Sequence, residues 1–269
     1  MTSAALAHRV AQRRRSRGLV AIFDLDGTLA PIAPRPDAAR VPVATRRALT
    51  RLCRRSDTTV GVVSGRRLAE VIRMLHGVER KLFLAGIHGY EARTPGGRVG
   101  RRWTTAEEHA GTRLHRTLDA AFRGSSRIRT ERKGPVVAVH TRGASPAERR
   151  LVRATVRRLR PAGHRLLEGR RVLEVRPASA PTKADAVRWI ATARPGAALL
   201  YVGDDTTDED AFRALSNGDV AVLVGGARSA AEQEGRRSMR RRRSSPRALR
   251  FGLSGPAAVG RLIARLAAS

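Results

Sequence analysis

The hydrophobic positions of the chain form short continuous runs that alternate with segments of helical periodicity. Apolar runs at 19–23, 58–63 and 81–85 are each followed by glycine, hydroxyl or charged residues, which is typical of strands buried on both faces. Between them, residues 42–54 and 68–75 repeat apolar side chains every three to four positions, and this predicts amphipathic helices. Strands that alternate with helices predict a parallel sheet with helices on its faces.

This rhythm changes in the middle of the chain. The pattern there predicts an exposed strand at 98–103, a helix at 105–123, a strand at 136–140, a helix at 148–159 and a hairpin built from 166–167 and 172–175. Helices combined with antiparallel strands indicate a separate small α+β unit. We therefore expect residues 105–176 to form a smaller domain, inserted in a larger α/β domain made of residues 1–104 and 177–269.

The alternation of strands and helices returns after the small domain. We expect a helix at 181–192, a strand at 197–202, a helix at 209–215, a strand at 220–224 and a closing helix at 257–266. Three prolines make residues 30–40 a loop. Residues 1–17 are expected to form a polar, frayed helix that leads into the first strand.

The charge of the chain is strongly positive, with 54 Lys and Arg against 23 Asp and Glu and a net charge of +31. Arginine supplies nearly all of it, because lysine occurs only as Lys81, Lys133 and Lys183. Aromatic residues make up 3% of the chain, which leaves little for stacking on nucleic-acid bases. We favour a general excess of arginine on solvated surfaces, and we expect the basic run Arg236–Arg243 to be a solvated, mobile segment. A nucleic-acid patch on that run is the alternative.

The single cysteine, Cys53, excludes a disulfide framework and a cysteine-based zinc site, and its apolar neighbours indicate a small core residue. No apolar run approaches the about 20 residues that a membrane span requires. We expect a soluble, cytoplasmic monomer that has no contact with membranes.

Two carboxylates follow the first predicted strand. Asp24 and Asp26 are separated by one residue and followed by Gly27 and Thr28. Carboxylates held this close repel each other unless a cation or a shared proton relieves them, and Mg²⁺ prefers oxygen ligands of this kind. A strand that ends in an ordinary polar turn is the alternative interpretation of these residues alone.

Three further groups follow predicted strands or begin predicted helices: Ser64 with Arg66, Lys183, and the acidic run Asp204–Asp210. The carboxyl ends of parallel strands and the amino ends of the connecting helices meet at one edge of such a sheet, so these groups can converge. A carboxylate can attack phosphorus, a second one can transfer protons, and a cation with a lysine and a hydroxyl can neutralise the phosphate.

In this order, these motifs resemble the haloacid dehalogenase (HAD) superfamily of phosphatases. The amino-acid sequences of these motifs resemble those of the trehalose-6-phosphate phosphatase family. The similar stretches are Asp-x-Asp-Gly-Thr-Leu-Ala-Pro-Ile from Asp24, Val-Ser-Gly-Arg to Arg66, Ala-Gly-x-His-Gly-x-Glu to Glu91, Glu131-x-Lys133-Gly134, Val139-His140-x-Arg142, the six residues 172–177, and Gly-Asp-Asp-x-Thr-Asp-Glu-Asp-Ala-Phe to Phe212. The resemblance covers about residues 19–224. It implies a Rossmann-like parallel-sheet core with an inserted α+β cap.

The resemblance also implies roles for particular residues. Asp24 would be the nucleophile and Asp26 the acid and base, while Ser64 and Lys183 would hold the phosphate. The Mg²⁺ site would involve Asp24, the carbonyl of Asp26, and Asp204, with two further carboxylates beside it, Asp205 and Asp208.

Sugar recognition is implied for the cap, where Glu131, Lys133 and Glu174 match positions that grip hydroxyl groups. Three more residues match positions that line the site: Arg66, His88 and Arg142. The pattern alone also allows His88 to be a core histidine and His140 to face solvent. Ala184 replaces the glycine that usually follows the lysine of the family, and the basic run Arg236–Arg243 has no counterpart there.

We therefore expect a Mg²⁺-dependent phosphatase that hydrolyses trehalose 6-phosphate through a phospho-aspartate. One alternative keeps the chemistry and changes the substrate to another sugar phosphate, such as glucosylglycerate phosphate or sucrose phosphate. An alternative of another class is a basic protein associated with nucleic acid, against which the few aromatic residues and the complete acidic motif set argue.

Overall fold

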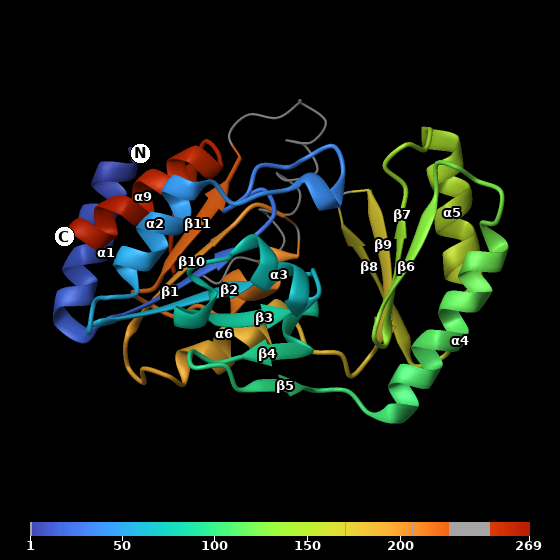
Figure 1. The fold of residues 1–269 in the computed structure, drawn as a ribbon, viewed down its shortest axis with the longest axis horizontal. Helices are drawn as coiled ribbons and strands as arrows, with labels where there is room; N and C mark the ends of the chain where they lie inside the picture. The colour runs from blue at the N-terminus through green and yellow to red at the C-terminus, as the bar shows by residue number, and fades with distance from the viewer. Residues whose placement is uncertain (1, 170, 206, 226–247) are drawn as a thin grey trace. The chain divides into compact units, whose positions relative to one another are not determined.

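The computed structural model describes residues 2–169, 171–205, 207–225 and 248–269 (Figure 1). The basic run Arg236–Arg243 lies outside these residues. The chain divides into two compact units, one made of residues 1–100 and 181–269 and the other of residues 101–180. The domain limits predicted from the sequence, at 104/105 and 176/177, lie close to this division. That each part folds as an independent domain remains a prediction.

The larger unit is built on one eight-stranded sheet. Its strands in spatial order are β12 (Leu249–Leu253), β11 (Val220–Val224), β10 (Ala198–Gly203), β1 (Leu19–Asp24), β2 (Thr58–Val63), β3 (Phe83–Gly86), β4 (Glu91–Arg93) and β5 (Val99–Arg101). The strands from β12 to β3 are parallel, and β4 pairs antiparallel with β3. The predicted parallel α/β core is confirmed. All six residues of β1 are buried, as expected for a central strand covered on both faces.

Helices cover both faces of this sheet and enclose a hydrophobic core on each. One core includes side chains of α1 (Ser3–Arg17), α2 (Val43–Leu52), α3 (Leu68–Met74) and α9 (Pro256–Ala268). The other is formed with α6 (Lys183–Ala191) and α7 (Asp208–Arg213). The described residues of this unit also form three short 3₁₀ turns: η1 (Pro36–Ala38), η2 (Glu79–Lys81) and η3 (Ile87–Gly89).

The first helix, α1, is an integral part of the larger unit. Leu6 and Val10 are buried in the core that α9 also lines. The Arg14 side chain is 1% exposed, donates a hydrogen bond to the Leu266 carbonyl at 2.7 Å and forms an ion pair with Asp57 at 3.2 Å. The helix predicted for residues 1–17 is present and largely polar, as expected, but its buried contacts contradict the expectation that it is frayed.

The smaller unit is an antiparallel sheet with two helices on one face. Its strands in spatial order are β6 (Arg129–Lys133), β7 (Val136–His140), β9 (Val172–Pro177) and β8 (His164–Gly169). Helices α4 (Thr105–Ala121) and α5 (Pro146–Leu159) lie along the same side of this sheet in Figure 1. Its hydrophobic core includes Leu114 of α4, Val137 of β7, Val156 of α5 and Val175 of β9. The predicted α+β insertion is confirmed.

None of the helices in the described part of the chain combines the length and the apolar character needed to cross a membrane.

Candidate active site

The central strand β1 lies where the chain connections change direction. From β1 the chain proceeds to β2 on one side, and after the inserted unit it returns to β10 on the other side. Ligands of open α/β sheets bind beyond the carboxyl ends of the strands at such a switch point. Asp24 is the last residue of β1, and Asp204 directly follows β10. The topology therefore places two of the predicted carboxylates at the expected position.

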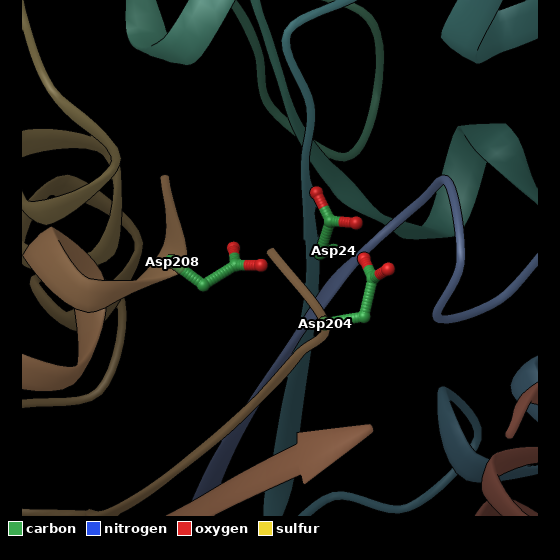
Figure 2. A group of neighbouring side chains, drawn as sticks. All are labelled: Asp24, Asp204 and Asp208. Atoms are coloured by element: carbon green, nitrogen blue, oxygen red, sulfur yellow. The ribbon is translucent and has the colours of Figure 1, made fainter. Parts of the chain in front are cut away.

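Three carboxylates gather at this edge of the sheet: Asp24, Asp204 and Asp208. Each offers one oxygen atom, and these atoms lie within 4.8 Å of one another. Figure 2 shows the three side chains: Asp24 comes from the end of β1, and Asp204 and Asp208 come from one segment much later in the sequence. Their exposed fractions are 5%, 5% and 0%. The approach of Asp24 to Asp204, on which the interpretation of the sequence depends, is therefore present.

Two glycines permit this close packing. Gly27 has φ +81°, a left-handed conformation, and a Cβ atom placed there would lie 2.1 Å from Oδ2 of Asp204. A Cβ atom on Gly203 would lie 2.4 Å from Cγ of Asp208. Any larger residue at either position would displace a carboxylate of the cluster.

The ammonium group of Lys183 contacts two carboxylates of this cluster. A capping box of Thr182 and Asp185 begins α6 at this residue. Its Nζ donates hydrogen bonds to Oδ1 of Asp24 at 2.7 Å and to Oδ1 of Asp208 at 2.6 Å. Burial by itself disfavours the charged ammonium, but the carboxylates of Asp208 and Asp24 outweigh it and raise the pKa of Lys183. The lysine therefore stays charged and holds two carboxylates in place.

The environment of Asp24 disfavours its ionised form. Burial raises the pKa of Asp24 well above its ordinary value, and the charges of Asp208 and Asp204 add to this effect while Lys183 opposes it. One ammonium thus compensates only part of the charge of three carboxylates. A cation bound among them would remove the remaining repulsion.

Asp208 is held by two groups besides Lys183. The hydroxyl of Tyr201 donates to its Oδ1 at 2.6 Å, and the amide of Asp205 donates to its Oδ2 at 2.9 Å. The side chain of Asp205 does not belong to the three-carboxylate group. Our interpretation of the sequence missed Tyr201, although a phenol in the otherwise aliphatic strand Ala198–Gly203 was the available signal.

Asp26 lies in the turn after β1, outside the carboxylate group. Arg66 binds both of its oxygens, with Nε 2.6 Å from Oδ2 and Nη2 2.8 Å from Oδ1. The Nη1 of Arg66 also lies 3.4 Å from Oε1 of Glu70. This paired geometry fixes the direction of the Asp26 carboxylate more firmly than a single hydrogen bond would. The structure thus brings Arg66 to Asp26, a contact that the sequence did not indicate.

Ser64 and His88 meet in the loops after β2 and β3. Ser64 is 2% exposed, and its Oγ accepts a hydrogen bond from the amide of Arg66 at 3.1 Å. His88, with φ +58°, donates its amide to the Ser64 carbonyl at 2.9 Å. A Cβ atom on Gly65 would lie 2.8 Å from Nε2 of His88, so the imidazole packs on this glycine. Since a left-handed histidine costs backbone energy, its position is held by the surrounding contacts.

The donor set of this edge suits a hard divalent cation. All three clustered side chains are carboxylates, and no histidine or cysteine belongs to the group that the described residues form. Such oxygen ligands are typical of Mg²⁺ sites, where one or two carboxylates act together with a phosphate. The described residues therefore contain an acidic cluster that could hold a metal ion.

The predicted sugar-binding residues lie in the smaller unit, on the face of its sheet opposite the two helices. The strand register aligns Glu131 of β6 with Ala138 of β7 and Glu174 of β9. Nζ of Lys133 lies 3.1 Å from Oε1 of Glu174, and both side chains are buried. The structure therefore brings these three predicted residues to one sheet face.

Two further residues lie at the end of β7 in this unit. Nε2 of His140 lies 2.7 Å from Oε2 of Glu131, so His140 does not simply face solvent, which the pattern alone had allowed. Arg142 is exposed in the turn beyond β7, and its carbonyl accepts a hydrogen bond from Arg171 at 3.0 Å.

The parallel sheet, the inserted α+β unit and the carboxylates at the strand ends define the fold of the HAD superfamily of phosphatases. Solved structures support this assignment. The C-terminal domain of Candida albicans trehalose-6-phosphate phosphatase matches with a TM-score of 0.78 at 19% identity, over 100% of this chain and 98% of that one. An Aspergillus fumigatus trehalose-6-phosphate phosphatase matches with a TM-score of 0.64 at 25% identity, over 100% and 99%.

The sequence profile of the trehalose-phosphatase family matches residues 22–244, and the chain belongs to this family. A trehalose-phosphate phosphatase of Mycobacterium avium is 38% identical over 210 residues, which cover 74% of this chain and 51% of the relative. A probable trehalose-phosphate phosphatase of Sinorhizobium fredii is 33% identical over 208 residues, 76% of each chain. An uncharacterized glycosyl hydrolase of Mycobacterium tuberculosis is 37% identical over 214 residues, 76% of this chain and 16% of the relative. The chain thus spans about half of the length of the M. avium relative and a smaller part of the M. tuberculosis relative.

Proposed function

We propose that this protein is a Mg²⁺-dependent phosphatase that converts trehalose 6-phosphate into trehalose and phosphate. One observation carries the proposal. A buried carboxylate at the end of the central strand, Asp24, lies 2.7 Å from a buried ammonium and within 4.8 Å of two further carboxylates, in a chain that the trehalose-phosphatase profile matches over residues 22–244. A nucleophile, a phosphate-binding cation and a potential metal site are therefore close together.

The proposed reaction has two steps. An oxygen of Asp24 attacks phosphorus and the bond from phosphorus to the sugar oxygen breaks, while Asp26 gives a proton to that oxygen. Asp26 then takes a proton from a water molecule, which attacks the phospho-aspartate and releases phosphate. Each step replaces one phosphorus–oxygen bond by another, so no oxidant or further reactant is required.

Other residues of the larger unit bind and orient. Lys183 and Ser64 would hold oxygens of the transferring phosphoryl group. Arg66 would keep the Asp26 carboxylate in a fixed direction through the paired contacts of 2.6 and 2.8 Å. His88 would support the loop that carries Ser64, to whose carbonyl its amide donates at 2.9 Å.

The proposed Mg²⁺ would be held by Asp24 and Asp204, with the Asp26 carbonyl as a further ligand and Asp205 and Asp208 close by. When bound, this ion supplies positive charge that neutralises the phosphoryl oxygens and the clustered carboxylates. Buried carboxylates that repel each other favour such an ion, and the pKa of Asp24 is raised first by burial and then by the charges of Asp208 and Asp204.

The smaller unit would recognise the sugar. Trehalose offers hydroxyl groups and no charge, and charged side chains form strong hydrogen bonds with hydroxyls. Glu131, Lys133 and Glu174 provide such groups on one sheet face, and Arg142 is proposed to contribute from the neighbouring turn. A monomeric state, a cytoplasmic location and the absence of a nucleic-acid partner remain predictions of the sequence.

The test is phosphate release from trehalose 6-phosphate, with and without EDTA, and with Asp24→Asn. We expect both changes to abolish turnover, because one removes the ion and the other removes the nucleophile. Asp37→Asn is the matched control, since its side chain is 69% exposed. Turnover that persists in EDTA and in Asp24→Asn would contradict the proposal.

A second measurement tests the choice of sugar. The same enzyme is assayed on trehalose 6-phosphate, sucrose 6-phosphate and glucosylglycerate phosphate. We expect the largest kcat/KM for trehalose 6-phosphate. A higher value for either of the other substrates would retain the phosphatase chemistry and replace the assigned sugar.

A further inference from the structure

The contact of His140 with Glu131 has no role in the reaction proposed above. Nε2 of His140 lies 2.7 Å from Oε2 of Glu131, and their side chains are 23% and 25% exposed. Arg129 also approaches Oε2, at 3.8 Å, with a side chain that is 58% exposed. Both basic groups thus approach the same oxygen of Glu131, and the shorter contact comes from the histidine.

The other oxygen of this carboxylate is available. Among the residues that the structure describes, none donates a hydrogen bond to Oε1 of Glu131. A carboxylate with one anchored oxygen keeps acceptor capacity on the second. Glu131 can therefore accept a hydrogen bond from a ligand without giving up the contact that orients it.

The register of the sheet explains why this contact requires His140. Glu131 stands directly opposite Ala138, and Arg129 stands directly opposite His140. Ala138 is too short to contact Glu131 with a polar group, so the glutamate reaches diagonally to the next side chain on the same face of β7. Val137 and Val139, on the other face, belong to the hydrophobic core under the helices. His140 is thus the polar residue of β7 that faces Glu131.

The electrostatics agree with a fixed, ionised Glu131. Burial favours the neutral carboxyl, but the hydrogen bond from His140 and the charge of Lys133 outweigh it, and the pKa of Glu131 is about 2. Lys133 itself pairs with Glu174 at 3.1 Å. The ammonium therefore acts on Glu131 mainly through its charge, whereas His140 supplies direction.

We propose that His140 is a positioning residue for substrate recognition: it anchors one oxygen of Glu131 and so presents the other oxygen to a sugar hydroxyl. This inference rests on the proposed function, which assigns sugar binding to Glu131. His140 acts through Glu131 and does not contact the reacting phosphoryl group. Its loss should therefore weaken binding of the sugar and leave the chemical step unchanged.

The experiment compares His140→Ala, His140→Gln and His115→Ala in the full chain. Gln carries an amide nitrogen at a position similar to Nε2 of histidine, so it can donate to Glu131. His115 is the matched control, because it lies on α4 and contacts Thr130 at 3.3 Å, a neighbour of Glu131 that points to the opposite face of β6. We measure kcat and KM for trehalose 6-phosphate, and the inhibition constant of trehalose, which lacks the phosphate.

We expect His140→Ala to raise KM and the inhibition constant of trehalose about tenfold, the loss of one charge-assisted hydrogen bond, with kcat within about twofold of wild type. His140→Gln should restore both constants to within about threefold, and His115→Ala should leave them unchanged. Unchanged constants in His140→Ala, or a loss confined to kcat, would overturn the proposal.

A double-mutant cycle separates positioning from direct contact. If His140 acts through Glu131, His140→Ala should have no further effect on either constant in a Glu131→Ala background. The same tenfold loss in that background would overturn the inference, because His140 would then act independently. Failure of the proposed function is distinguishable from this result, since it would appear as a wild-type protein that does not release phosphate from trehalose 6-phosphate.

Discussion

The two units of this protein carry charged groups in opposite ways. At the edge of the parallel sheet, three carboxylates face one ammonium, all of them buried. On the antiparallel sheet of the smaller unit, two glutamates meet two basic side chains in separate pairs of 2.7 and 3.1 Å. An unbalanced cluster stores repulsion that a cation relieves, whereas balanced pairs keep their geometry without one. The first arrangement suits phosphoryl chemistry and the second suits recognition of a neutral polyol.

The backbone creates each arrangement by a different geometric rule. In the larger unit, residues far apart in the sequence meet because parallel strands end at one edge. In the smaller unit, residues meet because alternate side chains of neighbouring strands share one face. Changes at the strand ends should therefore affect the reaction and the fold together, while changes on the sheet face should affect binding or local electrostatics.

The largest expected effect is that of Lys183→Gln. Removing the ammonium deprives the phosphoryl group of a positive partner, and we expect kcat to fall about 10²- to 10³-fold. It also leaves Asp24 and Asp208 without their shared donor, so the free energy of unfolding in EDTA should fall by about 3 kcal/mol. Kinetics on trehalose 6-phosphate and urea unfolding measure these changes. Lys81→Gln, at an exposed lysine of the same unit, is the control and should change neither.

Gly27→Ala should have the next largest effect. A Cβ atom would lie 2.1 Å from Oδ2 of Asp204, so this carboxylate must move. A displacement of this size should lower kcat/KM about 10²-fold. Gly77→Ala is a matched control, since Gly77 also has a left-handed φ, +90°, and nothing lies within 4 Å of the added atom. Equal activity losses in the two variants would assign the effect to backbone strain instead of the carboxylate cluster.

Tyr201→Phe should have a moderate effect. The change removes the 2.6 Å hydrogen bond to Asp208 and leaves the contact from Lys183 in place. We expect kcat to fall about tenfold and the free energy of unfolding to fall by about 1 kcal/mol, the typical net contribution of one hydrogen bond. An unchanged kcat together with lower stability would show that Tyr201 supports the fold without orienting the site.

The smallest expected effect concerns pH and Glu131. The carboxyl of the unfolded chain takes up its proton near pH 4.5, whereas folded Glu131 stays ionised down to about pH 2. Its stabilising contribution is therefore present above pH 4.5 and is lost as pH falls toward 2. Because the side chain is 25% exposed, we expect on the order of 1 kcal/mol. Urea unfolding of wild type and Glu131→Gln should differ at pH 6, and the difference should shrink below pH 4.5 and vanish as the pH approaches 2.

Much of this fold could be predicted because the buried strands are apolar throughout. The runs at 19–23, 58–63 and 220–224 are all strands of the parallel sheet. Three strands were missed. β6 has the sequence Arg-Thr-Glu-Arg-Lys, whose four charged residues lie on both faces of the sheet and gave no strand signal. β4 has only three residues, and β12 has an arginine, Arg250, as its second residue and a glycine as its fourth.

For α1 and for the carboxylate site, the sequence predicted the element or motif but not the contacts of its side chains. The helical character of α1 was readable from its sequence, but arginine dominated its composition and concealed the apolar stripe of Leu6 and Val10. The approach of Asp24 to Asp204 followed from strand order and motif. The pairings of Arg66 with Asp26 and of His140 with Glu131 depend on side-chain directions, which the spacing of motifs does not specify.

The order of the strands has a consequence for synthesis on the ribosome. The neighbours of β1 are β2 and β10, and β10 lies after the complete inserted unit. Residues 101–180 form a contiguous segment whose sheet pairs only within itself, so this unit can fold as soon as it has emerged. Until β10 has been synthesised, one edge of β1 has no partner strand, and this edge can bind chaperones or associate with other chains. The cluster of Asp24, Asp204 and Asp208 is thus completed only after the inserted unit has been made, because β10 and the two later carboxylates follow that unit in the chain.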